Sequence, residues 1–238
     1  LHAFVSKSKY SKEKFDKVLE RINSKTKVDF SFNELPHQNW NALWESNFEP
    51  VFIENKLAII APFHALESNF ERTILIEPKM SFGTGHHQTT HMMCASILNA
   101  SLEEKTILDM GSGTGVLAIL CEMKGAEKVL AVDIEPWSVE NCRNNAKVNN
   151  CTRIEAVLGD IEAINANRFD AIFANINKNI LLSHMSDYVK ALNSNGFLYL
   201  SGFFSSDAQE IKDAAEGLGL SLSSKSEREG WCMLVLKK

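Results

Sequence analysis

Three glycines in alternate positions, Gly111, Gly113 and Gly115, follow an apolar run at residues 107–110 that carries one acid, Asp109. Glycine has no Cβ atom, so a glycine-rich backbone can turn tightly and approach a ligand closely. The G-x-G-x-G spacing differs from the G-x-G-x-x-G pattern of dinucleotide-binding loops. A carboxylate beside the loop attracts a cationic amino-acid group and repels a pyrophosphate. These residues therefore predict a loop that binds a nucleoside cofactor with a positively charged end.

Two further acids each end an apolar run downstream of the glycines. Asp133 follows residues 129–132, at the distance where an acid on the neighbouring strand accepts hydrogen bonds from both ribose hydroxyls. Asp160 follows residues 156–159 and is placed to accept a hydrogen bond from the exocyclic amine of adenine. An alternative role for Asp160 is to cap a helix that begins at Ile161.

A loop rich in glycine and hydroxyl groups, residues 82–90, precedes the glycine-rich loop. Such a segment must bend sharply while it presents many hydrogen-bond donors. We therefore interpret its first part, which consists of Phe82, Gly83, Thr84 and Gly85, as a lid or wall of the cofactor site.

The glycine-rich loop, with Asp109 two residues before its first glycine, resembles the first motif of the class I S-adenosylmethionine methyltransferases. The segment F-G-T-G-x-H-x-T-T at residues 82–90 resembles the PrmA family, which methylates large-subunit ribosomal protein eleven. The resemblance continues through residues 39–40, Trp44, and the stretches at 61–64 and 174–176. It covers nearly the whole chain from residue 39 onward. Many family members carry Thr and Pro where His86 and Gln88 stand in this sequence.

The resemblance implies a cofactor, a substrate and a set of contacts. The implied cofactor is S-adenosyl-L-methionine. The implied substrate is the ribosomal protein, which is methylated on lysine side chains, on its N-terminal amine, or on both. The residues that the resemblance implies as cofactor contacts are Thr90, Gly111, Asp133 and Asn175.

Asn175 ends a further apolar run at residues 169–174. Methyl transfer from sulfonium to an amine is an in-line displacement, so the nitrogen lone pair must point at the methyl carbon. The Asn175 side-chain oxygen, together with the Ile176 carbonyl, can accept hydrogen bonds from the amine and orient that lone pair. We therefore predict Asn175 as the catalytic residue. A turn residue at a strand end is the alternative interpretation.

Two other functions remain open at this point. One is methylation of another nitrogen, in a small molecule, an RNA or a glutamine amide. The N-P-P-Y segment that grips planar amides and bases is absent at residues 175–178, which argues against glutamine and adenine as targets. The other is a non-catalytic cofactor-binding module in ribosome assembly.

The histidines of the 82–91 segment raise the possibility of a metal site. His87 and His91 are four residues apart, but neither an H-E-x-x-H motif nor a nearby Cys/Asp cluster accompanies them. We therefore predict no metal and assign these histidines to packing. His87 could instead contact the substrate amine or the cofactor.

Composition favours a globular cytoplasmic enzyme. The 238-residue chain is 45% hydrophobic and 23% charged, and its apolar runs are too short to cross a membrane. Its five cysteines show no C-x-x-C pairing and no signal segment precedes them, which favours a reducing compartment. The net charge of −5 argues against direct nucleic-acid binding and is compatible with a basic protein partner.

The elements that must position these residues alternate from residue 92 onward. We predict helices at 92–99, 115–124, 137–148, 180–192 and 206–217, and strands at 106–110, 128–133, 154–158, 169–175 and 197–201. A closing pair of strands at 221–224 and 232–236 flanks a charged turn at 225–229. This pattern predicts a doubly wound, Rossmann-like α/β sheet with an antiparallel edge hairpin.

The amino-terminal region has a different pattern. Strands predicted at 1–5 and 28–32 flank a helix at 11–23, which is half of a ferredoxin-like unit. We expect residues 1–35 to be a partial substrate-recognition domain whose earlier half is missing from the chain. Residues 36–64 are predicted to form a connector, with Trp40 and Trp44 as packing residues, and strands at 51–53 and 57–61. Residues 65–238, with one more strand at 73–76, form the predicted methyltransferase domain.

Overall fold

A computed structural model describes residues 10–24, 26, 29, 31, 49–64, 70–77, 81–164 and 167–238 of the chain. The chain divides into two compact units, Leu1–Trp44 and Glu45–Lys238. The predicted strand at 1–5, most of that at 28–32, and the connector with Trp40 and Trp44 lie outside the described residues.

The smaller unit contains helix α1, Lys12–Asn23, within the range that the sequence predicts. Ser11 caps the helix by accepting a hydrogen bond from the Lys14 backbone N–H. Its apolar face is open to solvent: Val18 is 56% exposed and Ile22 is 42% exposed.

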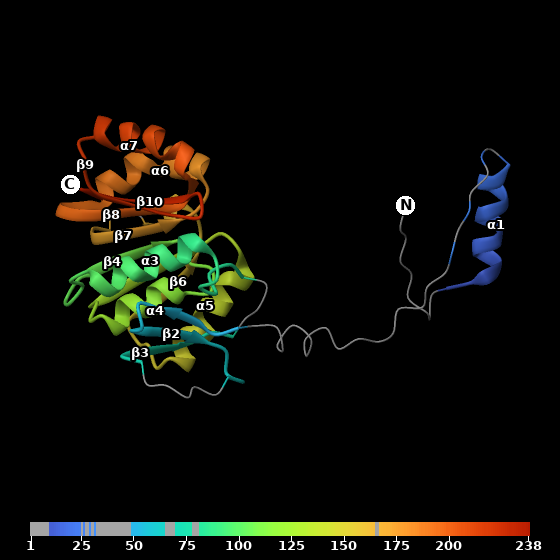
Figure 1. Ribbon diagram of the computed structural model, residues 1–238, viewed down its shortest axis with the longest axis horizontal. Helices are drawn as coiled ribbons and strands as arrows, with labels where there is room; N and C mark the ends of the chain where they lie inside the picture. The colour runs from blue at the N-terminus through green and yellow to red at the C-terminus, as the bar shows by residue number, and fades with distance from the viewer. Residues whose placement is uncertain are drawn as a thin grey trace. The chain divides into compact units, whose positions relative to one another are not determined.

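The larger unit is built on a seven-stranded sheet whose order is β6-β5-β4-β7-β8-β10-β9 (Figure 1). Five strands are parallel, and β10 runs antiparallel to both β8 and β9. The strands are β4 (Thr106–Met110), β5 (Lys128–Asp133), β6 (Ile154–Leu158), β7 (Phe169–Asn175), β8 (Leu192–Phe204), β9 (Ser221–Arg228) and β10 (Trp231–Lys237). The predicted fold class, including the antiparallel hairpin, is confirmed.

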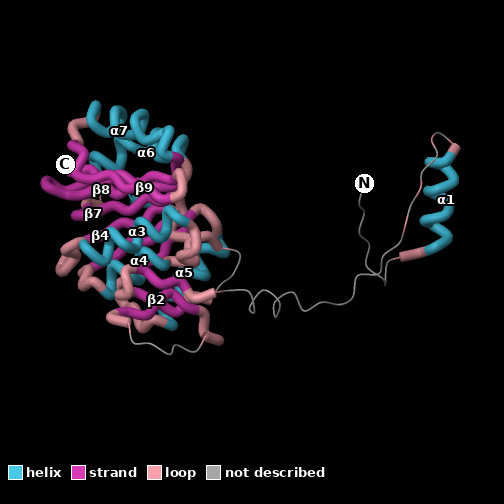
Figure 2. The backbone as a smooth tube through the Cα atoms, in the orientation of Figure 1, coloured by secondary structure: helices cyan, strands magenta, loops and turns pink. Residues whose placement is uncertain are grey.

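Helices cover both faces of this sheet (Figure 2). Helices α3 (Gln88–Asn99), α4 (Val116–Met123) and α5 (Pro136–Val148) cover one face, and α6 (Lys178–Ala191) and α7 (Ala208–Gly217) cover the other. Successive strand residues alternate between two buried clusters. Ile107 of β4 belongs to the cluster under α3 and α4, whereas Leu108 belongs to the cluster under α6 and α7. No helix in the described part of the chain has the length and apolar character that a membrane span requires.

A second, three-stranded sheet packs against α3 and α4. It comprises β1 (Val51–Ile53), β2 (Leu57–Ile60) and β3 (Arg72–Leu75), with β2 antiparallel to β1 and parallel to β3. Asn149, the C-cap residue of α5, bonds to the end of β3: its side chain accepts from Leu75 N (2.9 Å) and donates to Leu75 O (2.7 Å). The sequence predicts these strands, but nothing in it indicates that they form a separate sheet.

Several predicted boundaries differ from the structure. The strand predicted at 197–201 is longer at both ends, since β8 spans Leu192–Phe204. Two further differences have identifiable reasons. Helix α3 begins at Gln88 rather than at residue 92, because His87 caps it by accepting from Thr89 N. Of the charged segment predicted as a turn at 225–229, all but the last residue belongs to β9. Its backbone pairs with β10, with Lys225 opposite Leu234, and an edge strand with mostly exposed side chains tolerates charge on both faces.

Candidate active site

The parallel strands β4, β5, β6 and β7 end at one edge of the large sheet, which we call the carboxyl edge. Parallel α/β sheets bind their ligands at this edge, in the loops that follow the strands. The sequence-predicted site residues lie at the carboxyl ends of these strands, in the loops that follow them, or in the 82–90 segment, so the fold brings them to one region.

Backbone hydrogen bonds join the glycine-rich loop to the end of β5. Gly111 N and Ser112 N both donate to Val132 O, at 2.8 and 3.0 Å. Asp133 accepts from Gly113 N at Oδ2 (2.8 Å) and from Glu135 N at Oδ1 (2.9 Å). A carboxylate oxygen has two lone pairs, so each Asp133 oxygen can accept one more hydrogen bond. The predicted ribose acid and the predicted cofactor loop therefore form one rigid unit.

The segment Phe82–Gly85 lies directly against the glycine-rich loop. Thr114 N donates to Phe82 O (2.9 Å), and Thr114 Oγ1 donates to Gly83 O (2.6 Å). At Gly113, where φ is +53°, a Cβ atom would lie 2.2 Å from Phe82 O. No side chain fits between the two segments at this point, so the first part of the 82–90 loop lies directly beside the glycines. Its predicted role as a lid or wall of the cofactor site stays a prediction.

Asp109 is buried beneath the glycine-rich loop, with 1% of its surface exposed. Its Oδ2 accepts from Ala118 N (3.1 Å), and its Oδ1 has no hydrogen-bond partner. Burial raises the pKa of the Asp109 carboxyl from 3.8 to about 7, against the lowering effect of the Ala118 hydrogen bond. A buried acid with one unpaired oxygen favours the binding of a cation nearby.

Asn175 ends β7 and faces Thr90 of α3. Its Nδ2 donates to Thr90 Oγ1 (3.3 Å), and its Oδ1 is closed off from solvent with no hydrogen-bond partner. Thr90 itself is 1% exposed. The two residues that the family resemblance pairs as cofactor contacts thus touch each other, and one acceptor oxygen stays unsatisfied. Unsatisfied buried acceptors are rare in folded proteins, so this oxygen is a candidate acceptor for a ligand.

Asp160 follows β6, next to the end of β5: Gly159 N donates to Asp133 O (3.0 Å). Its Oδ1 accepts from Ile161 N (2.8 Å), the first residue of the 3-10 helix η1 (Ile161–Ile164). His184 Nε2 of α6 lies 3.7 Å from the same oxygen. Asp160 therefore caps the short helix and stands beside Asp133, so the two interpretations that the sequence left open are compatible.

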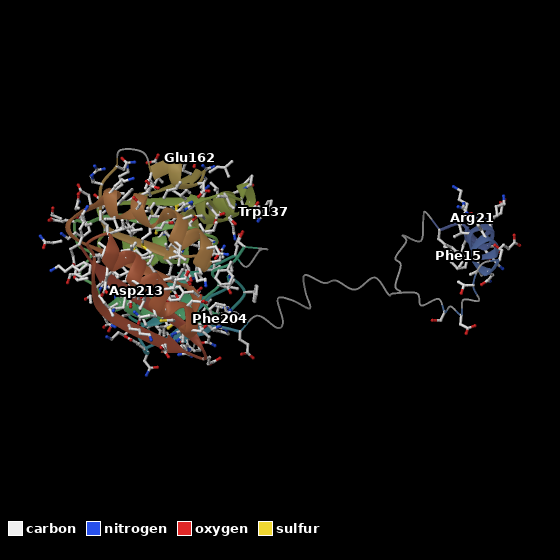
Figure 3. All side chains as sticks on the ribbon, turned by 90° about the horizontal axis from the view of Figure 1, so that it is seen from above. Phe15, Arg21, Trp137, Glu162, Phe204 and Asp213 are labelled. Atoms are coloured by element: carbon white, nitrogen blue, oxygen red, sulfur yellow. The ribbon has the colours of Figure 1, made fainter. Side chains whose placement is uncertain are left out.

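An aromatic cluster that the sequence does not reveal lies at the same edge. It comprises Phe82, His87, Phe204 and Trp231, with ring centroids 5.2 Å apart for Phe82–His87, 4.6 Å for His87–Trp231 and 4.3 Å for Phe204–Trp231. Phe82 is 56% exposed and Phe204 is 52% exposed; Figure 3 shows Phe204 at the surface of the larger unit. Trp231, predicted as a packing residue, packs within this cluster.

Side chains of the 82–90 segment fix it to distant parts of the larger unit. Gln88 donates to Glu229 Oε2 (2.7 Å) and accepts from the Arg228 guanidinium, which ties the start of α3 to the β9–β10 turn. His86 contacts Thr84 Oγ1 (3.0 Å) and the Glu49 carbonyl (2.9 Å). Within the described ranges, no three His, Cys, Asp or Glu side chains gather as metal ligands would.

The arrangement suits a nucleoside cofactor with a cationic tail better than a phosphate ligand. The three glycine positions of the loop have no room for a Cβ atom, Asp133 can accept from hydroxyls, and a buried acid lies beneath the loop. The polar side chains named above at this edge, those of Asp109, Asp133, Asp160, Asn175 and Thr90, are carboxylates, an amide and a hydroxyl. At the β7 end, the unpaired Asn175 oxygen adds an acceptor for an amine.

Comparison with known proteins points to one family. The family described as Ribosomal protein L11 methyltransferase (PrmA) matches residues 1–238. A ribosomal protein L11 methyltransferase of Porphyromonas gingivalis is 43% identical over 201 residues, which cover 84% of this chain and 69% of that protein. One from Bacteroides fragilis is 38% identical over 97% of this chain and 84% of its own length. The crystal structure of ribosomal protein L11 methylase from Lactobacillus delbrueckii subsp. bulgaricus matches with a TM-score of 0.74 at 28% identity, over 79% of this chain and 98% of that chain.

Proposed function

The chain belongs to the PrmA family of ribosomal protein L11 methyltransferases, and we propose on this basis that it transfers methyl groups from S-adenosyl-L-methionine to amino groups of ribosomal protein L11. The observation that carries the chemical part of the proposal is the buried, unpaired Oδ1 of Asn175 at the carboxyl edge. An N-methyltransferase needs such an acceptor for the protons of its target amine.

The cofactor-binding role falls to the loops after β4, β5 and β6. Asp133 would accept from the ribose hydroxyls, Asp160 from the adenine amine, and Asp109 would balance the charge of the amino-acid tail. The complete set that we propose for cofactor binding is Phe82, Gly83, Thr84, Gly85, Thr90, Asp109, Gly111, Gly113, Asp133, Asp160 and Asn175. When bound, S-adenosyl-L-methionine supplies an electrophilic methyl group on a sulfonium.

Asn175 would act as the catalytic residue by orientation rather than by proton transfer. Its Nδ2 is committed to Thr90, which fixes the amide plane and leaves Oδ1 as the acceptor. An amine whose N–H groups donate to Oδ1 and to the Ile176 carbonyl has its lone pair directed away from both. When the lone pair is held in this direction, the amine reacts from a fixed position instead of by a random encounter with the methyl group. This orientation is the main contribution to the reaction rate that the site can make.

The target amine must lose a proton before it reacts, because a lysine ammonium has a pKa of about 10.4 in water. A poorly hydrated, apolar surrounding lowers the pKa of an amine. The aromatic cluster of Phe82, His87, Phe204 and Trp231 offers such a surrounding beside the site. His87 lies within the cluster and could also contact the amine.

The proposal is tested by methyl transfer from radiolabelled S-adenosyl-L-methionine, with purified ribosomal protein L11 and ribosomal RNA offered separately. We expect label in the protein, on amino groups located by mass spectrometry, and none in the RNA. Label in RNA alone would assign the chain to another nitrogen substrate. Cofactor binding by calorimetry without any transfer would favour a non-catalytic assembly module.

We also propose a cytoplasmic setting, where ribosomal proteins are made. All five cysteines are free thiols in the structure, which supports a reducing compartment. Fractionation of cells that express the protein, followed by immunodetection, would contradict this proposal if the protein were recovered outside the cytoplasmic fraction.

A further inference from the structure

Helix α6 contributes a buried histidine to the neighbourhood of Asp160, and the mechanism above does not use it. His184 has 9% of its surface exposed, and its Nε2 lies 3.7 Å from Asp160 Oδ1. One turn further along α6, the hydroxyl of Tyr188 lies 3.5 Å from His184 Nδ1. Tyr188 is fully buried. The three side chains form a line from the core to the loop after β6.

The hydroxyl of Tyr188 is placed to select the tautomer of His184. Burial raises the pKa of the Tyr188 hydroxyl, so it keeps its proton and can donate. If Tyr188 donates to Nδ1, then a neutral His184 carries its own proton on Nε2, the nitrogen that faces Asp160. A hydrogen bond at one ring nitrogen of a histidine often determines in this way which proton the other nitrogen carries.

Both groups that act on the Asp160 carboxylate act on the same oxygen. Ile161 N donates to Oδ1 at 2.8 Å, and His184 Nε2 approaches Oδ1 as well. Among the described residues, no protein group donates to Oδ2. The hydrogen bond from Ile161 N thus holds Oδ1, His184 Nε2 faces the same oxygen from 3.7 Å, and Oδ2 is left for a ligand. The side chain of Asp160 is 46% exposed, so Oδ2 is accessible to a ligand.

We propose that His184 is a positioning residue that orients Asp160 for recognition of the exocyclic amine of adenine. This inference rests on the proposed function, in which Asp160 contacts the adenine of the cofactor. Adenine donates two N–H groups at this position, whereas hypoxanthine presents a carbonyl oxygen, which a carboxylate repels. A fixed carboxylate therefore discriminates between the two bases, and a carboxylate that rotates freely discriminates less.

The test measures binding, by calorimetry, of S-adenosylhomocysteine and of its deaminated analogue S-inosylhomocysteine. We expect the unaltered protein to prefer the adenine compound by at least about tenfold. His184→Phe should reduce that preference by about fivefold, while His184→Gln, which keeps an N–H donor, should retain most of it. Lys190→Ala, an exposed position on the same helix, is the matched control and should leave the preference unchanged.

The other possible outcomes show which claim is wrong: the role of His184, the role of Asp160, or the proposed function. If Asp160→Asn lowers the preference but His184→Phe, shown to be folded by circular dichroism, does not, the role of His184 is overturned. Equal loss in His184→Phe and His184→Gln would also overturn it, because a purely structural histidine would give that result. If Asp160→Asn leaves the preference intact, the adenine role of Asp160 is wrong. Failure of the unaltered protein to bind S-adenosylhomocysteine would overturn the proposed function and this inference together.

Discussion

The two halves of the carboxyl edge differ in how their polar groups are satisfied. In the loops after β4, β5 and β6, backbone N–H groups and carboxylates bond to one another, as Gly113 and Asp133 do. At the ends of β7 and β8 and the start of β10, aromatic rings dominate and the Asn175 oxygen has no partner. The first half is built before any ligand arrives. In the function that we propose, the substrate amine completes the second.

The same contrast explains which half the sequence reveals. The first half lies in one stretch, residues 107–160, and each of its acids lies at or near the end of an apolar strand, so residue spacing alone is sufficient to predict it. The second half combines Phe82, His87, Asn175, Phe204 and Trp231 from four separate segments, and only the folded sheet brings them together.

Gly113 should give the largest effect, in the first half. Its φ of +53° is unfavourable for alanine, and the added Cβ would lie 2.2 Å from Phe82 O, so the wall and the loop must separate. We expect Gly113→Ala to weaken the binding of S-adenosylhomocysteine on the order of 100-fold, measured by calorimetry.

The matched control is Gly217→Ala, in α7, where a Cβ would have nothing within 4 Å. That variant should bind as the unaltered protein does. If the Gly113 variant binds as tightly as the unaltered protein, close contact between the two loops is not needed for the cofactor. That result would contradict the account of the first half as a preformed cofactor site.

Asn175→Ala should have the next largest effect, on turnover. Removal of the amide takes away the acceptor that would orient the amine, so we expect kcat to fall by about 100-fold. The dissociation constant for S-adenosylhomocysteine should change by no more than about threefold. Steady-state kinetics and calorimetry on the same preparation separate these effects. The reverse pattern, with a large loss of cofactor affinity and little loss of turnover, would leave Asn175 as a cofactor contact and remove its catalytic role.

Trp231→Ala should act mainly on the protein substrate. Trp231 contacts both His87 and Phe204, so its removal opens the aromatic cluster. We expect the KM for ribosomal protein L11 to rise by about tenfold with cofactor affinity unchanged. Leu218→Ala, which is 43% exposed in the turn after α7, is the control for the loss of a surface apolar side chain. A similar rise of KM in both variants would contradict a role for the cluster.

Asp109 is an exception in the first half of the carboxyl edge, because its Oδ1 has no hydrogen-bond partner. The unfolded carboxyl releases its proton near pH 3.8 and the folded one near pH 7, so the free energy of unfolding falls as pH rises through that window. The full cost, above pH 7, is up to about 4 kcal/mol. Asp109→Asn should therefore raise Tm at pH 8 and much less at pH 5, in thermal denaturation without cofactor. An equal shift at both pH values would mean that ionisation of Asp109 does not set the effect.

Strand and helix positions follow from the sequence wherever burial on two faces imposes a pattern. The strands β4, β5, β6 and β7 have the predicted ends, because their side chains alternate between two cores. Strand β9 has little burial, so its length depends on backbone pairing with β10 and the charged residues gave no indication of it. His184 went unnoticed for a similar reason, since only the packing of α6 brings it to Asp160.

The site assignments of both halves remain predictions, and one crystal structure would test them together. The protein crystallised with S-adenosylhomocysteine should show the ribose hydroxyls on the Asp133 carboxylate, the amino-acid tail beside the glycine-rich loop, and Asn175 facing the sulfur. A ligand bound away from Gly111, Gly113 and Asp133 would contradict the account.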